Sequence, residues 1–181
     1  MSDVRWFRQP DRRSCGAATM VTARMLHEAA YAVQVRDQAA FSTEALLLHR
    51  RLTSLRGPGG LQLPWPRALG TPPWAVAGYL GALTGRRYRV RWVARRGVRE
   101  LVAARKSVLA GAPVAIYVGS RWLPRHVVLG VAAPDDGLLL YEPSAGALRT
   151  IAPGPWRWHR LGLAGWRRPW FVVLPDDARS R

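Results

Sequence analysis

Cys15 is the only cysteine in this chain of 181 residues, so it cannot form an internal disulfide or build a thiolate metal site by itself. Two roles remain for it, a small buried side chain or a nucleophile. A polar, proline-containing stretch leads up to Cys15, and small residues that open a predicted helix follow it directly. Because unpaired N–H groups at a helix N-terminus favour a thiolate, the local sequence favours the nucleophile.

Gln9 and Gly16 flank this cysteine at short distances along the chain. The side-chain amide of Gln9 could donate an N–H group to the oxygen of a carbonyl under attack, a role that suits a neutral donor. Gly16 has no side chain and would let another segment approach the nucleophile closely. The pattern predicts an oxyanion-hole role for Gln9.

A thiolate nucleophile needs a proton acceptor, normally histidine, and the chain has 4 histidines. His27 would share the nucleophile's helix, about 18 Å along its axis, which is too far to reach. His49 falls in a predicted surface helix, and His159 in a segment rich in Arg and Trp. His126 opens an apolar run that predicts a buried strand, so its side chain would point from a rigid frame into a cleft.

The apolar run 126–133 is followed by the turn 134–137 and by a second predicted strand, 138–142. A hairpin of this length brings Glu142 back beside His126. Glu142 would then accept the ring N–H and orient the imidazole. The sequence therefore predicts a triad of the cysteine, this histidine and this glutamate.

Four short motifs follow one another along the chain: Gln9, Cys15-Gly16, His126-Val127-Val128 and Glu142-Pro143-Ser144-Ala145-Gly146. This ordered set resembles the papain superfamily and, within it, is most similar to the bacterial double-glycine leader peptidases and their stand-alone relatives. The resemblance spans residues 9–146 and implies a papain-like fold, with the nucleophile's helix packed on a sheet that carries the base.

By the same resemblance, Cys15 is the nucleophile, His126 the base, Glu142 the residue that orients the base and Gln9 the oxyanion donor. Two positions depart from the family pattern. Glu142 stands where the family has Asp or Asn, so the orienting group is one methylene longer. Ser14 occupies a position often held by Asp.

The implied activity is that of a cysteine peptidase, which cleaves a peptide or amide bond through a thioester intermediate. The implied partner is a peptide or protein substrate. The same residues could instead pass the acyl group to an amine, and a non-catalytic basic module on the same fold could bind peptides or nucleic acid. No cofactor is implied, and the spacing of His and acidic residues does not match a zinc site.

The formal net charge is +17, from 28 basic and 11 acidic residues, which predicts a positive surface that attracts acidic partners. Arg and Trp interleave in segment 155–170, a pattern that can stack on bases and bind phosphates. No zinc, helix-turn-helix or RNP-type signature accompanies it. The sequence therefore favours a solvated basic face, or a docking face for an acidic protein partner, over specific nucleic-acid binding.

We expect a single domain over residues 1–181, because this length is enough for one core, and a flexible tail at 175–181. The N-terminal residues lack the apolar region of a secretory signal, and no window has 18 apolar residues. These features predict a cytoplasmic protein without a membrane span. A reducing compartment would keep the thiol free.

The periodicity predicts helices first and an antiparallel sheet second, which is an α+β order. Helices are expected from Cys15 onward, over 42–54 with Ser42 as the cap, up to Thr84 from about Thr71, and from Val98 to a stop at Gly111. Strands are expected over 87–94, 113–118, 126–133, 138–142, 147–151 and 170–175. The segment 56–73, rich in Gly and Pro, is expected to be a long loop that forms a cleft wall or lid.

Two helix faces are expected to be buried. The first helix would bury Ala18, Val21, Met25 and Ala29. The fourth would bury Val98, Leu101, Val102, Val108 and Leu109.

Overall fold

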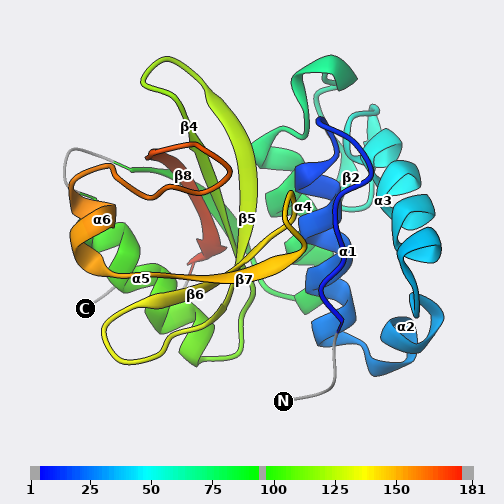
Figure 1. Ribbon diagram of the computed structural model, residues 1–181. Helices are drawn as coiled ribbons and strands as arrows, with labels where there is room; N and C mark the ends of the chain where they lie inside the picture. Colours follow the sequence, from blue (N-terminus) through cyan, green and yellow to red (C-terminus); the bar gives the residue numbers. More distant parts are fainter. Residues whose placement is uncertain (1–4, 94–96, 177–181) are drawn as a thin grey trace.

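A computed structural model describes residues 5–93 and 97–176 of the chain, as helices arranged around one large sheet (Figure 1). The expected tail from residue 177 onward lies outside the described residues, and so does position 94, the end of one predicted strand. Within the described ranges, no helix has both the length and the apolar character needed to cross a membrane.

Six antiparallel strands form the large sheet, in the order β3-β8-β4-β5-β6-β7. Their bounds are β3 Tyr88–Trp92, β4 Val114–Gly119, β5 Pro124–Ala132, β6 Leu138–Glu142, β7 Ala147–Ile151 and β8 Arg168–Pro175. β8 is the last strand in the chain, yet it lies between β3 and β4. Every predicted strand is therefore present: β6 and β7 have the predicted ends, and the ends of the other strands are shifted by at most two residues.

Helices cover both faces of this sheet (Figure 1). One side carries α1 Cys15–His27, α2 Ala29–Gln34, α3 Gln38–Leu52 and α4 Pro73–Thr84, and the other carries α5 Val98–Leu109 and α6 Pro153–Arg157. A sheet covered on both faces has buried side chains in both directions, as β4 shows with six buried residues in a row. The predicted α+β fold class is confirmed.

Helix α1 is buried nearly all round, because it lies between the sheet and α3. Ala18, Val21 and Met25 are buried as predicted. The prediction was wrong for Ala29, which is exposed. Glu28 leaves the helical conformation at φ −123° and ψ 101°, so the chain changes direction before Ala29, which begins α2.

Helix α3 begins four residues earlier than predicted, and Ser42 is not its cap. Asp37 caps it instead, because its carboxylate accepts a hydrogen bond from the backbone N–H of Ala40 at 2.8 Å. Helix α4 has the predicted form. It has a proline in its first turn, and it ends at Gly85, which has the left-handed conformation at φ 68°.

The buried face of α5 differs from the predicted one. Leu101 is buried, but Val98 and Val102 are each 44% exposed and Leu109 is 69% exposed. The buried face instead carries small residues such as Ala104 and Ser107. These let the helix approach β5 and β8 closely, so burial follows the shape of the contact rather than the largest apolar side chains.

The predicted loop 56–73 contains a short hairpin of β1 Arg56–Gly57 and β2 Gly60–Leu61, and a 3₁₀ turn at Arg67–Leu69. Gln62 holds the hairpin to the end of α3, since its side-chain amide donates to the carbonyl oxygens of Leu52 and Ser54 at 2.8 and 2.9 Å. Trp74 donates from its indole nitrogen to the carbonyl oxygen of Leu63 at 3.2 Å. The segment is thus held by specific bonds to its neighbours.

The Arg- and Trp-rich segment 155–170 is not a row of exposed rings. Trp156 is fully buried, and its indole nitrogen donates to the carbonyl oxygen of Gly97 at 2.8 Å. Trp158 is 64% exposed, whereas Trp166 and Trp170 are half-buried. A buried indole cannot stack on a base, so this segment lacks the continuous stacking surface that the pattern indicated.

Candidate active site

Cys15 is the first residue of α1, as predicted, and is 5% exposed. Ser14 precedes the helix at the cap position, but its side chain makes no capping hydrogen bond. The free N–H groups and the positive end of the helix dipole therefore act on the cysteine without competition from a cap. The thiol is free rather than in a disulfide.

His126 and Glu142 are in direct contact, with 2.6 Å between His126 Nε2 and Glu142 Oε1. Both side chains are buried. His126 is the third residue of β5 rather than the first, because Pro124 and Arg125 extend the strand past an irregularity in its pairing with β4. The predicted strand start was therefore wrong by two residues, and the predicted approach of Glu142 to His126 is present.

Glu142 has three further donors around its carboxylate. Oε1 accepts from the Ser144 backbone at 2.8 Å, while Oε2 accepts from the Ser144 hydroxyl at 2.8 Å and from the Ala145 backbone at 3.2 Å. Burial opposes ionisation, but the hydrogen bonds from His126 and Ser144 outweigh it and lower the pKa of Glu142 to about 2. The side chain is a fixed anion at neutral pH.

The imidazole of His126 is influenced by this anion and by Cys15. Burial disfavours its protonated form, but hydrogen bonds with Cys15 and Glu142 raise the pKa of His126 to about 9. Since Nε2 contacts Glu142, Nδ1 is the ring nitrogen that remains for Cys15. Cys15 and Glu142 thus both act on the pKa of His126.

Gln9 connects the turn after Glu142 to the loop before Cys15. Its backbone N–H donates to the carbonyl oxygen of Pro143 at 2.7 Å, and its side-chain Nε2 donates to the carbonyl oxygen of Asp11 at 2.5 Å. The Asp11 carboxylate in turn accepts from the Ser14 backbone at 2.8 Å. One N–H of the Gln9 amide is thus used within the loop, and its oxygen Oε1 is buried without a partner among the described residues.

Three residues near the nucleophile were not predicted from the sequence. Thr71 packs on Gly16, and Tyr117 donates from its hydroxyl to the carbonyl oxygen of Thr71 at 2.9 Å. Burial, together with the charge of nearby Cys15, raises the pKa of Tyr117. The Thr71 hydroxyl also lies 3.4 Å from Nδ1 of His49, which is buried.

The prediction that His49 lies on a surface helix was therefore wrong. Its Nε2 lies 3.3 Å from the carbonyl oxygen of Arg67, and burial lowers its pKa. The signal was present in the sequence. Phe41, Ala45, Leu48 and Leu52 are spaced as one helical face, and that face includes His49.

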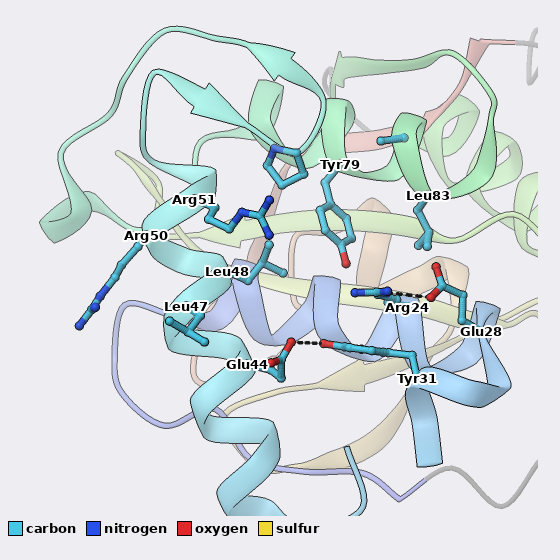
Figure 2. Close-up of a pocket in the computed structure, with 12 residues that line it drawn as sticks. Arg24, Glu28, Tyr31, Glu44, Leu47, Leu48, Arg50, Arg51, Tyr79 and Leu83 are labelled. Atoms are coloured by element: carbon cyan, nitrogen blue, oxygen red, sulfur yellow. Dashed lines mark hydrogen bonds and ion pairs between the residues drawn. The ribbon is translucent and has the colours of Figure 1, made fainter. Parts of the chain in front are cut away.

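A cavity of about 620 Å³ lies elsewhere, among α1, α2, α3 and α4 (Figure 2). Some of its charged groups already have partners, since Arg24 contacts Glu28 and Tyr31 donates to Glu44, each at 2.8 Å. None of the four predicted site residues lines it. This cavity is therefore separate from the predicted site.

Comparison of the chain with known protein families found no match, and comparison with curated proteins found none either. Among solved structures, the chain is similar to the peptidase domain of Streptococcus ComA, described as a bifunctional ABC transporter involved in a quorum-sensing pathway. The similarity covers 96% of this chain and 99% of that one, at 12% sequence identity and a TM-score of 0.51. At this identity the likeness is one of fold: the protein has the α+β fold of a papain-like peptidase domain.

Proposed function

We propose that this protein is a papain-like cysteine peptidase of the double-glycine leader peptidase type, acting on a peptide or protein substrate. One observation carries the proposal: a buried histidine, His126, contacts the carboxylate of Glu142 at 2.6 Å and is near enough to Cys15 for that side chain to raise its pKa. The fold shared with a peptidase domain supports it. A cytoplasmic, reducing location would keep the thiol active.

In the first half of the reaction, His126 takes the proton of Cys15, and the sulfur attacks the carbonyl carbon of the scissile amide. The developing oxyanion accepts hydrogen bonds from the side-chain amide of Gln9 and the backbone N–H of Cys15. The imidazolium then gives its proton to the leaving amine as the C–N bond breaks. The acyl group remains on the sulfur as a thioester.

In the second half, His126 removes a proton from water, which attacks the thioester carbonyl and releases the acid and the thiol. Glu142 acts throughout by holding Nε2 of the ring, which keeps Nδ1 toward the sulfur and stabilises the imidazolium. An amine in place of water would give acyl transfer by the same steps. Adding a primary amine and weighing the products by mass spectrometry separates the two reactions.

The first test is alkylation by iodoacetamide between pH 4 and 9. The chain has one cysteine, so the mass of the intact protein counts a single reaction. We expect fast labelling at pH 6, where an ordinary thiol, which titrates near pH 8.5, reacts slowly. The His126→Ala variant should lose this advantage, whereas His27→Ala, which removes an exposed histidine from the far end of α1, should keep it.

Labelling that is slow at pH 6, or that is the same in the wild type and His126→Ala, would contradict the proposal. The alternative would then be a non-catalytic basic module on this fold. The net charge of +17 is the observation that favours that alternative. If labelling is fast, cleavage of peptide libraries by the wild type, with Cys15→Ala as the blank, identifies substrates.

A further inference from the structure

A second, smaller cavity lies on the sheet near His126. Its volume is about 160 Å³, and it is lined by Trp92, Val93, His159, Arg168, Pro169 and Trp170. No acidic residue lines it. These residues come from β3, from β8 and from the loop after α6, so segments far apart in the sequence build this cavity.

His159, which lines this cavity, has a ring nitrogen without a hydrogen-bond partner among the described residues. Its Nδ1 accepts from Arg168 Nε at 3.2 Å, so in the neutral ring the proton is on Nε2. Nε2 is buried and has no hydrogen-bond partner among the described residues. Burial and the adjacent guanidinium lower the pKa of His159, which keeps the ring neutral. Its backbone has φ 54°, a strained conformation of the kind found at ligand sites.

Among the described residues, Arg168 is the only other charged or titratable group that lines the cavity. Its guanidinium makes no ion pair within the described residues, and its remaining contact is a long one, 3.5 Å from Nη1 to the carbonyl oxygen of Arg121. Its terminal N–H groups are therefore available. Together with His159 Nε2–H, they form a set of donors without an acceptor, which suits a carboxylate.

The aromatic walls are set by an irregularity in the sheet. β4 residue Tyr117 pairs with Phe171, but the next residue, Val118, pairs with Pro169, so Trp170 is an extra residue on β8. Such a bulge redirects a side chain. Trp170 lies against Trp92 edge to face, with 5.2 Å between the ring centres.

The volume of the cavity limits the size of a ligand that it can hold. A water molecule occupies about 30 Å³ in the liquid, so the cavity holds roughly five waters or one carboxylate group with its first carbons. Sites for drug-sized ligands and cofactors measure about 300–1,000 Å³. The cavity is therefore too small for a nucleotide or a whole cofactor.

Strand pairing places the cavity relative to the proposed catalytic residues. Val118 of β4 pairs with His126 on one side and with Pro169, a cavity residue, on the other. Two strand spacings separate His126 from Pro169, which is about 10 Å. An extended peptide covers this distance in about three residues.

We propose that this cavity binds a carboxylate of the peptide substrate, about three residues from the bond that Cys15 attacks. The inference rests on the proposed function. The carboxylate comes either from an Asp or Glu side chain or from the C-terminus of a peptide. Arg168 binds it through its terminal N–H groups, and His159 donates a third hydrogen bond.

The test uses Cys15→Ser protein, which cannot turn over substrate, and isothermal titration calorimetry. Three blocked pentapeptides serve as probes: one with a central Glu and an amidated end, the same peptide with Gln, and the Gln peptide with a free C-terminal carboxylate. We expect the Glu peptide, the free-carboxylate peptide or both to bind about 10–100-fold more tightly than the amidated Gln peptide. Comparison of the Glu peptide with the free-carboxylate peptide shows whether the bound carboxylate is a side chain or a C-terminus.

Arg168→Gln should abolish this preference, and His159→Asn, which tolerates the positive φ, should weaken it several-fold. Arg167→Gln is the matched control, because it removes the same charge from the neighbouring, exposed residue. Circular dichroism confirms that each variant is folded. If Arg168→Gln does not fold, the carboxylate preference of His159→Asn, measured with the same three peptides, tests the proposal.

Equal binding of all three peptides, or the same loss with Arg167→Gln as with Arg168→Gln, would overturn the proposal in favour of a general charge effect. Inorganic phosphate that displaces the Glu peptide and itself binds more tightly would also overturn it. The two proposals fail separately. Carboxylate preference without any cleavage by wild-type protein removes only the peptidase assignment, and cleavage with equal kcat/KM for Glu and Gln peptides removes only the carboxylate site.

Discussion

The backbone of Gly16 lies directly against the side chain of Thr71. A Cβ at position 16 would come within 2.6 Å of Thr71 Cβ and 2.8 Å of its hydroxyl oxygen. Thr71 is itself held, since its carbonyl oxygen accepts from Tyr117 and its hydroxyl lies 3.4 Å from His49. The residue after the nucleophile therefore has a fixed position set by three other elements.

Gly16→Ala should destabilise the protein by about 1–3 kcal/mol, because the added methyl group overpacks a well-filled contact. It should also slow iodoacetamide labelling at pH 6, since the start of α1 must shift away from His126. Urea denaturation and labelling rates measure the two effects. Gly154→Ala is the control, because nothing lies within 4 Å of a Cβ there. Wild-type stability and labelling in Gly16→Ala would refute the prediction.

Glu142→Gln should lower the free energy of unfolding most between pH 4.5 and 6.5. Folding lowers the pKa of Glu142 from 4.5 to about 2. The contribution of Glu142 to the free energy of unfolding is therefore complete above pH 4.5 and is lost as the pH falls through 2. Folding raises the pKa of His126 from 6.5 to about 9, so its contribution is complete below pH 6.5 and is lost as the pH rises through 9.

The loss at pH 5.5 should be on the order of 3 kcal/mol, as for removal of one member of a buried ion pair. Denaturation curves at pH 3, 5.5 and 9.5 measure it. A double-mutant cycle with His126→Ala isolates the pair from other effects of each substitution. A loss of the same size at all three pH values would show that the pair does not titrate in this way.

In the peptidase reaction, Glu142→Gln should reduce kcat less than His126→Ala does. Gln keeps an oxygen that can accept from Nε2 and so preserves part of the orientation, whereas Ala removes the base itself. Single-turnover rates on one peptide substrate provide the comparison. The reverse order would assign the main proton-transfer role to the carboxylate.

Gln9→Ala should reduce kcat by about 10²–10³, as removal of one oxyanion donor does, with a small change in KM. Gln34→Ala, at an exposed position in α2, is the matched control and should leave both constants unchanged. A change confined to KM would show that Gln9 binds the substrate without stabilising the transition state.

Asp37→Ala should destabilise the protein by about 0.5–2 kcal/mol, because it leaves the N–H of Ala40 without its cap. Ser42→Ala should have a smaller effect, since that hydroxyl lies inside α3 and accepts only from Gln38 at 3.0 Å. Thermal denaturation of the two variants side by side tests the order. A larger loss for Ser42→Ala would contradict the observed start of the helix.

The hairpin that carries His126 and Glu142 was predictable because its determinants are local. Continuous apolar runs flank the turn 134–137, in which the Gly137 N–H donates to the Pro134 carbonyl oxygen at 2.9 Å. The length of the two arms then brings the acid back to the histidine. The start of α1 at Cys15 was predictable for the same reason, since small residues follow a proline-containing stretch.

The surroundings of the nucleophile were not predictable, because they depend on contacts between distant segments. Tyr117 reaches Thr71 across 46 positions, and Trp156 reaches Gly97 across 59. Neither pair has a local sequence signal. The prediction of the buried face of α5 was wrong for a related reason. Close packing on the sheet buries small residues such as Ala104, while the larger Val102 stays exposed.

The position of β8 in the sheet, between β3 and β4, has a consequence for the timing of synthesis. Among the described strands, β3 pairs only with β8, residues 168–175. The pairing of β3 can therefore form only after β8, the last of these strands to be synthesised, has left the ribosome. The N-terminal segment also waits, because the Phe7 carbonyl oxygen accepts from Tyr141, 134 positions later. A nascent chain therefore exposes Cys15 long before His126 and Glu142 exist beside it.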